Sequence, residues 1–257
     1  MNNINATQES REIHLNTIQE SLGQCQGVAQ KFIVKSIKSN QTHEWLLNKH
    51  YMKRLTCISY AFGLFYKNDL MGICTYGSAL PSNMRRGVCG IQYESIVYEL
   101  NRLCIDDAVP KNTLSFFVAQ TLRLLSKPKI LVSYADIAVG HNGYIYQATN
   151  WIYTGLSHTQ KDWKLKGREH LHSRTLMDEF PFQKDRIKKL KEKYGDDLYQ
   201  IERKPKNRYV YLIGTKKQKK EMLKELKYEI MPYPKGENKR YDASYKPIIQ
   251  RELFTTI

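Results

Sequence analysis

The feature that most constrains the fold is the alternation of strand-like and helix-like segments in the middle of the chain. Near-alternating apolar residues predict a strand over 96–103, and an apolar-faced helix is predicted over 115–125, after Pro110. The same order then repeats, with a strand over 129–135 and a short helix over 144–151. A chain in which strands and helices alternate folds into an α/β sheet with helices packed against it.

The preceding segments add strands to the same predicted sheet. Residues 28–37 indicate a strand, and Thr42 is placed to cap a short helix. Two aromatic-rich strands over 59–66 and 70–76 predict a hairpin, and the Pro- and Gly-containing segment 77–90 predicts a loop. The expected fold class is therefore α/β, with a mixed sheet flanked by helices.

The last third of the chain is predicted to form a basic α/β extension. Helices are expected over 182–194 and 216–227, a strand over 208–214, and an extended segment from Tyr228 onward. The chain is thus divided into a polar N-terminal arm (1–27), a catalytic domain (28–175) and a basic C-terminal extension packed on the core (176–257).

Positive charge is concentrated in the C-terminal part. The chain of 257 residues has 41 Lys and Arg against 25 Asp and Glu, and residues 159–251 alone hold 26 against 14. Such an excess suits a polyanionic partner, most simply nucleic acid, although a solvated surface explains any single lysine run. The sequence has no apolar run as long as a membrane helix and no signal-peptide pattern at its start, so we expect a cytoplasmic protein.

The cysteines predict free thiols. Five of them, in odd number and without CxxC spacing, argue against a disulfide framework and a Cys-type zinc site. They are Cys25, Cys57, Cys74, Cys89 and Cys104. A catalytic role for Cys104, which lies close to Arg102 in sequence, is kept as an alternative.

Several strings resemble the Mom family of phage DNA-modification proteins, over roughly residues 28–175. The longest and most specific is GHNGYIYQATNWIYTGLS (140–157). The others are HYMKR (50–54), ELNRLCIDD (99–107), PKNTLSFFVAQTLRLL (110–125) and SYAD (133–136). The resemblance implies an acetyltransferase-like (GNAT) fold and conversion of adenine in DNA to N6-(carbamoylmethyl)adenine, which protects phage DNA from restriction in the cytoplasm of the bacterial host.

The resemblance also implies cofactors. An acetyl-CoA-type acyl donor is the expectation from the fold, with its phosphates at the start of the helix after Pro110, where Asn112, Thr113 and Ser115 lie. The glycine-rich loop typical of such sites is absent, and simple helix capping is the alternative. Fe2+ is a second implied cofactor, with His50, Tyr51, Asp136 and Tyr146 as its expected ligands.

Five residues are the expected catalytic set: His50, Tyr51, Arg102, Asp136 and Tyr146. Asp136 is the carboxylate expected to accept a proton, and Tyr146 the phenol expected near the acyl group. Each has a structural alternative: a capping aspartate, a core tyrosine, a surface histidine, or an arginine paired with Glu99. His141 is a further acid/base candidate.

Double-stranded DNA is the expected partner, with the target adenine flipped out of the helix because its N6 amine lies inside a base pair. Basic residues of a predicted loop and of the C-terminal part are the expected phosphate contacts. They are Arg85, Arg86, Lys161, Lys164, Lys216, Lys217, Lys219 and Lys220. A homodimer is left open.

Two other functions remain open on sequence grounds. An ordinary acetyltransferase would act on a protein or small molecule and would not depend on DNA. A non-enzymatic DNA-binding protein would tolerate replacement of Asp136. The basic C-terminal part counts against the first, and the grouping of Asp136, the glycine-flanked loop and Tyr146 counts against the second.

Overall fold

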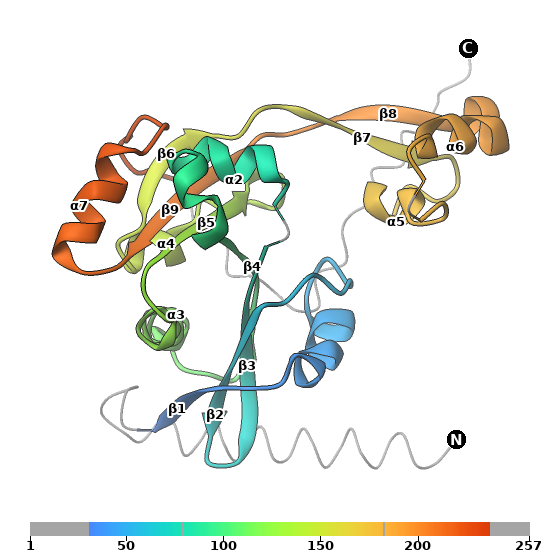
Figure 1. The fold of residues 1–257 in the computed structure, drawn as a ribbon. Helices are drawn as coiled ribbons and strands as arrows, with labels where there is room; N and C mark the ends of the chain where they lie inside the picture. Colours follow the sequence, from blue (N-terminus) through green and yellow to red (C-terminus); the bar gives the residue numbers. More distant parts are fainter. Residues whose placement is uncertain (1–30, 79, 182, 237–257) are drawn as a thin grey trace, which may run out of the picture.

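The computed structural model describes residues 31–236 except 79 and 182. The predicted N-terminal arm and residues 237–257 lie outside the described residues. A central seven-stranded sheet organises the chain (Figure 1). Its order is β1 (Phe32–Ser36), β2 (Tyr60–Tyr66), β3 (Asp69–Gly77), β4 (Val97–Ile105), β5 (Lys129–Asp136), β9 (Lys206–Ile213) and β6 (Ile152–Leu156).

One pair of neighbouring strands in this sheet is parallel, and it is short. β4 and β5 pair only where Val97–Glu99 faces Ile130–Val132, whereas every other neighbouring pair is antiparallel. The last direct link is a side-chain contact, in which the Ser133 hydroxyl lies 2.9 Å from the Leu100 carbonyl oxygen. Beyond this point the two strands separate, and this opening positions the candidate site.

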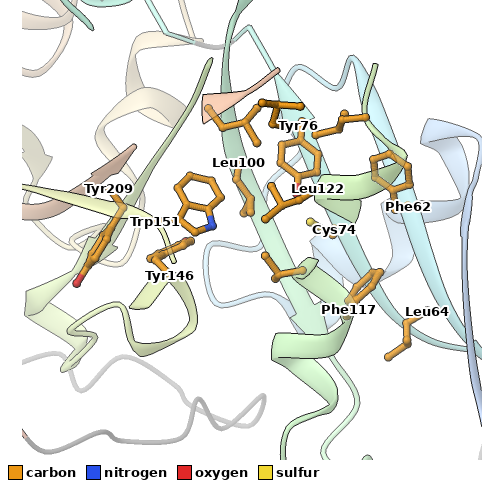
Figure 2. Packing of buried hydrophobic residues seen from close by; sticks show 14 of the residues in the cluster. Phe62, Leu64, Cys74, Tyr76, Leu100, Phe117, Leu122, Tyr146, Trp151 and Tyr209 are labelled. Atoms are coloured by element: carbon orange, nitrogen blue, oxygen red, sulfur yellow. The ribbon is translucent and has the colours of Figure 1, made fainter. Parts of the chain in front are cut away.

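Helices cover both faces of the sheet. Leu131 of β5 faces the cluster formed with α3 (Thr113–Leu124) and α4 (Tyr144–Ala148). Its neighbours Ile130 and Val132 face the opposite cluster, formed with α2 (Ser82–Cys89) and α7 (Lys216–Lys224). Alternate residues of a strand point to opposite faces, so the part of a central strand that is covered on both sides is a continuous apolar run, as Ile130–Val132 of β5 is. Figure 2 shows the first cluster, in which Trp151 and Tyr146 pack beside Leu100.

Short irregular helices complete the core. They are the 3-10 helices η2 (Ser39–Thr42), η4 (Ile91–Ile96), η5 (Ile137–Val139) and η6 (Gly195–Asp197), and the π-helix η3 (Trp45–Lys49). Trp45 and Leu46 of η3 pack on Ile73 and Cys104. The helix thereby fixes the segment that follows it, which carries His50 and Tyr51.

A separate arm lies between β6 and β9 in the chain. It consists of the two-stranded sheet of β7 (Gln160–Leu165) and β8 (Leu198–Arg203), with α5 (Ser173–Met177) and α6 (Arg186–Tyr194). It projects from the central sheet at the upper right of Figure 1. The arm has its own small core of four buried leucines: Leu165, Leu176, Leu190 and Leu198.

The predicted fold class is confirmed, and three local predictions are wrong. The loop over 77–90 contains α2, because Pro81 precedes its first turn and Val88 and Cys89 bury one face. Thr42 caps no helix, since its hydroxyl donates to the Ser39 carbonyl within a 3-10 turn. The predicted helix over 144–151 ends at Ala148, and the chain continues as β6.

The C-terminal part contributes to the central sheet. β9 pairs with β5 on one side and with β6 on the other. After α7 the chain returns over the core, where the Met231 amide donates to the Tyr153 carbonyl at 3.0 Å and the Tyr233 hydroxyl donates to the Trp151 carbonyl at 2.7 Å. The sheet is therefore not completed within residues 28–175.

We predict that a chain ending at residue 175 does not fold on its own. Without β9, the backbone donors and acceptors of the buried strand β5 lose their partners on one side, which costs more than a small domain's stability. Circular dichroism and thermal unfolding of residues 28–175 check this, with the full chain as the control. A cooperative unfolding transition in the fragment would contradict it.

Candidate active site

The candidate site begins with a β-bulge in β4. The pairing of β3 with β4 shifts between Thr75, opposite Arg102, and Tyr76, opposite Leu100, so that Asn101 is the extra residue. The Asn101 amide holds this geometry by donating to the Cys57 carbonyl at 2.8 Å. A bulge reverses the alternation of side chains, so Glu99 and Arg102 lie on the same face of the strand.

Arg102 is buried and incompletely bonded. The residue is only 9% exposed, and its Nη1 atom donates to the Asn101 carbonyl oxygen at 2.6 Å. Its Nε atom has no hydrogen-bond partner among the described residues. Burial lowers the pKa of the guanidinium, but arginine stays charged in proteins. A buried charged donor without a partner is costly, so it marks a place where a ligand gains binding energy.

Glu99 is the carboxylate nearest in sequence to Arg102, yet the two form no ion pair. No hydrogen bond or ion pair joins the Glu99 carboxylate to another described residue. Burial raises its pKa to about 7, and the charges of Arg102 and Lys206 oppose this rise. Glu99 is therefore close to half protonated at neutral pH.

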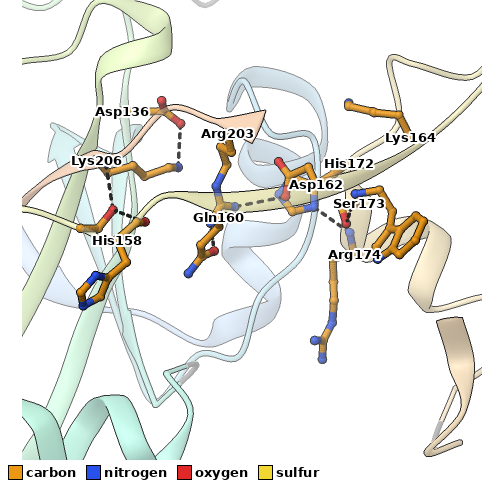
Figure 3. A network of polar contacts seen from close by, with 12 residues as sticks. Asp136, His158, Gln160, Asp162, Lys164, His172, Ser173, Arg174, Arg203 and Lys206 are labelled. Atoms are coloured by element: carbon orange, nitrogen blue, oxygen red, sulfur yellow. Dashed lines mark hydrogen bonds and ion pairs between the residues drawn. The ribbon is translucent and has the colours of Figure 1, made fainter. Parts of the chain in front are cut away.

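Asp136 lies across the opening, at the end of β5. Its Oδ1 atom accepts from the Ala138 amide at 3.0 Å and caps η5, as the structural alternative predicted. Its Oδ2 atom forms an ion pair with Lys206 Nζ at 2.6 Å (Figure 3). Lys206 is the direct partner of Asp136 in the register of β5 with β9, so the sheet itself places the two charges together.

His50 and Tyr51 close the site from the other side. Their rings are stacked with centroids 4.6 Å apart, and Tyr51 meets the edge of His141 at 6.4 Å. Burial, and then the Arg102 charge, lower the pKa of His50 to about 3, so the imidazole is neutral. Burial, and then Asp136, raise the pKa of Tyr51 to about 12.

Tyr146 lies at the point where β4 and β5 separate. Its hydroxyl is 2.7 Å from the Ser133 hydroxyl, and its ring packs against Trp151 and Tyr209 (Figure 2). Burial raises its pKa above the ordinary value, which keeps the phenol protonated. The Tyr146 ring therefore packs in the core, as the structural alternative predicted. Its hydroxyl lies at the opening between β4 and β5.

A cavity of about 690 Å³ lies along α3, between this helix, the end of α4, the end of β9 and α7, and none of the site residues described above lines it. Asn112 and Ser115 line it, as expected for a cofactor site, but Thr113 does not. The Thr113 side chain is fully buried, and its hydroxyl oxygen has no hydrogen-bond partner among the described residues. Three cations from separate elements also line the cavity: Arg123, Lys127 and Lys219.

The basic residues predicted to contact DNA fall into two groups. Arg85 and Arg86 both pair with Glu94, at 3.2 and 2.5 Å, and Lys164 donates to the Glu169 and Leu171 carbonyls. These contacts give them a role within the fold. The exposed ones are Lys161 on the arm and Lys216, Lys217, Lys219 and Lys220 on α7. DNA contacts by either group stay a prediction.

The iron ligands implied by the resemblance do not fit a bound iron as they stand. Both Asp136 oxygens are occupied, one of them by the Lys206 cation. His50 Nδ1 accepts the Met52 amide at 3.2 Å, and the Tyr146 hydroxyl is engaged with the Ser133 hydroxyl at 2.7 Å. Across residues 31–236, masked positions aside, no group of three or more His, Cys, Asp or Glu side chains is placed to hold a metal.

Sequence reasoning missed Lys206 as a site residue and gave Glu99 only a structural role. The signal for Lys206 is its register with Asp136, which requires the pairing of β5 with a strand some seventy residues later. Cys104, the alternative nucleophile, packs on Trp45 and Ile73, and burial raises the pKa of its thiol to about 12. Such a thiol is a poor nucleophile at neutral pH.

The fold and site define a mixed α/β protein in which titratable groups gather where the two parallel strands β4 and β5 separate. The chain belongs to the Mom protein family, whose model matches residues 31–235, and the predicted family is confirmed. Methylcarbamoylase Mom of Escherichia phage Mu is 28% identical over 247 residues, which cover 91% of this chain and 97% of that protein.

Solved acetyltransferase structures also align with the chain. An N-acetyltransferase from Staphylococcus aureus Mu50 has a TM-score of 0.38 at 11% identity, covering 70% of this chain and 98% of that one. An agmatine N-acetyltransferase has a TM-score of 0.38 at 11% identity, covering 71% and 100%. At such scores the alignments say nothing about substrate or cofactor. No helix in the described part of the chain is long and apolar enough to cross a membrane.

We predict that Glu99→Gln stabilises the protein at pH 8. The pKa of Glu99 is raised from 4.5 to about 7 on folding, so the stability it contributes is present at low pH and is lost as pH rises through this range. The gain in unfolding free energy is on the order of 3 kcal/mol at pH 8 and vanishes below pH 4.5. Urea unfolding at both pH values measures it.

Glu94→Gln is the matched control. Hydrogen bonds from Ser82 and Arg86 lower the pKa of Glu94, so its contribution is present above its ordinary pKa and is lost as pH falls. This variant is therefore destabilised at pH 8. A Glu99→Gln protein that is less stable than wild type at pH 8 would contradict the assignment of Glu99 as a buried, unpaired carboxylate.

Proposed function

We propose that the chain is a phage DNA-modification enzyme that converts adenine in DNA to N6-(carbamoylmethyl)adenine and so protects phage DNA from restriction. Membership of the Mom family and the methylcarbamoylase name of the phage Mu relative support this proposal. One observation carries it. Tyr51 lies within electrostatic reach of Asp136, Arg102 and Glu99, at the opening between β4 and β5. Two carboxylates, an arginine and a phenol are thus grouped at this opening.

The reaction forms a bond between adenine N6 and the methylene carbon of the carbamoylmethyl group and breaks the bond from that carbon to the leaving group of the donor. One N6 proton must therefore leave the amine, and the leaving group takes up a proton. Asp136 is the proposed acceptor of that proton, because it lies at the opening and its ion pair with Lys206 holds the carboxylate in place before the transfer. The Tyr146 hydroxyl, whose raised pKa keeps it protonated until that step, is the proposed proton donor to the leaving group. His50 is neutral and stacks on Tyr51, and it is proposed to hold the Tyr51 phenol in place.

The cavity along α3 is the proposed donor site. Arg123, Lys127 and Lys219 give it three positive charges, and Asn112 and Ser115 place it at the start of the helix. This combination suits a donor of the coenzyme A type, which carries several phosphates. Because the glycine-rich loop of such sites is absent, the phosphates are proposed to rely on side-chain cations instead.

Duplex DNA is the proposed substrate, with the target adenine flipped out. The exposed lysines of α7 give sequence-independent affinity for phosphates, in keeping with the net charge of +16. The N6 amine must leave the base pair before a group can be attached, and the aromatic rings at the opening offer a stacking surface.

The main test is to express the chain in bacteria and to analyse the adenosine fraction of digested DNA by mass spectrometry. We expect a species that carries a carbamoylmethyl group. Asp136→Asn should reduce it at least about a hundredfold, because a general base contributes roughly that much. Asp196→Asn, on an exposed aspartate away from the site, should modify DNA as wild type does. An unmodified pool with soluble wild-type protein contradicts the proposal.

A pair of neighbouring lysines separates donor binding from DNA binding. Lys219 lines the cavity, whereas Lys220 is exposed outside it on the same helix. Lys219→Glu should weaken binding of coenzyme A roughly tenfold, the cost of a charged hydrogen bond, while Lys220→Glu leaves that affinity unchanged. Lys220→Glu should instead weaken duplex DNA binding and reduce its salt dependence. Equal coenzyme A affinity in both variants would overturn the assignment of the cavity.

A further inference from the structure

Arg102, which is buried, and Glu99, which is partly buried, do not pair with each other although they are neighbours in the site. Glu99 and Arg102 lie on the same face of β4 because the bulge at Asn101 brings them there. Nevertheless they form no ion pair, and no other described residue pairs with the Glu99 carboxylate. The Arg102 Nε atom is likewise without a hydrogen-bond partner in the described part of the chain.

The contacts of neighbouring residues explain why Glu99 and Arg102 form no ion pair. The Arg102 guanidinium is turned along the strand, where Nη1 donates to the carbonyl of Asn101, the residue before it. The charged and titratable groups that face Glu99 come from four other elements as well as its own: Tyr51, Arg102, Tyr134, Tyr146 and Lys206. Of these, Lys206 is already paired with Asp136.

The combination defines a particular ligand chemistry. Arg102 offers N–H donors and Glu99 offers an oxygen acceptor, on the same face of one strand and within electrostatic reach of each other. A single anion would satisfy Arg102 and be repelled by Glu99, and a single cation would do the reverse. A planar group with an acceptor beside an N–H donor satisfies both at once, and a site built in this way rejects analogues that lack the N–H.

We propose that Glu99 and Arg102 form a two-point binding site for an amide-like edge, in which Glu99 accepts an N–H hydrogen bond and Arg102 donates to the neighbouring acceptor. The inference rests on the proposed function, which supplies two such edges. One is the N1 and N6 edge of the flipped adenine, and the other is the primary carboxamide of the carbamoylmethyl group. The raised pKa of Glu99 fits a carboxylate that awaits such a donor.

The test compares each edge with an analogue that keeps the acceptor and loses the N–H. Binding of 9-ethyladenine and its N6,N6-dimethyl derivative, and of glycinamide and its N,N-dimethyl derivative, is measured by calorimetry on the full wild-type chain. We expect one parent compound to bind roughly ten- to a hundredfold more tightly than its dimethyl analogue, the range for a hydrogen bond to a charged group. The series that shows this difference identifies the edge.

Variants assign the discrimination to the two residues. In Glu99→Leu the parent and its dimethyl analogue should bind equally, and in Arg102→Met both should bind at least tenfold more weakly. Glu221→Leu, on the exposed face of α7, is the matched control and should behave as wild type. The wild-type comparison of analogues needs no variant, so it decides the question even where a variant does not fold.

Two outcomes overturn the inference: wild-type protein that binds neither parent more tightly than its analogue, and Glu99→Leu protein that still discriminates. Nucleoside analysis on the same preparation keeps this result separate from the proposed function. Modified adenosine without discrimination overturns the two-point site alone. Discrimination without modified adenosine supports the site and counts against the proposed function.

Discussion

The backbone hydrogen bonds between β5 and β9 are the interaction on which the rest of the structure depends. A buried strand needs partners for its amides and carbonyls on both sides. β5 pairs with β4 over only three residues, whereas it pairs with β9 along its whole length, from Lys129 to Asp136. β9 therefore holds β5 in the sheet over the residues where β5 has left β4. The opening that holds the candidate site therefore depends on a strand from the basic end of the chain.

Much of the fold was accessible from the sequence because local patterns carry it. The hairpin of β2 and β3, the helix α3 and the strand β5 were predicted close to their observed bounds, since apolar alternation and helix punctuation are local signals. The edge strand β6 and the arm strands β7 and β8 were missed, because they are polar or short and their stability comes from pairing. Likewise α2 was hidden by the glycines and proline around it, although its buried face is amphipathic.

The candidate site was predictable in its residue types but not in its partnerships. Arg102, Asp136, Tyr51 and His50 were singled out from their strings, and the structure brings them to one opening. The sequence could not indicate which basic residue lies opposite each carboxylate. Asp136 meets Lys206 only through the register of two strands distant in sequence, and Glu99 meets Arg102 on one face only through a bulge. Both arrangements depend on tertiary structure. They make Asp136 an ion-paired carboxylate and leave Glu99 without an ion pair.

The arm has two ends that meet. The Ser157 amide donates to the Lys206 carbonyl at 2.8 Å, and the Lys206 amide donates to the Ser157 hydroxyl at 2.9 Å, so the chain leaves and re-enters the sheet at one hydrogen-bonded junction. The arm is therefore closed at its base by these hydrogen bonds, and its four buried leucines form a core separate from that of the sheet. Loop closure depends only weakly on loop length. The junction thus fixes the lysine that faces Asp136 at the base of the arm, so that its position is set by the sheet and not by the residues of the arm.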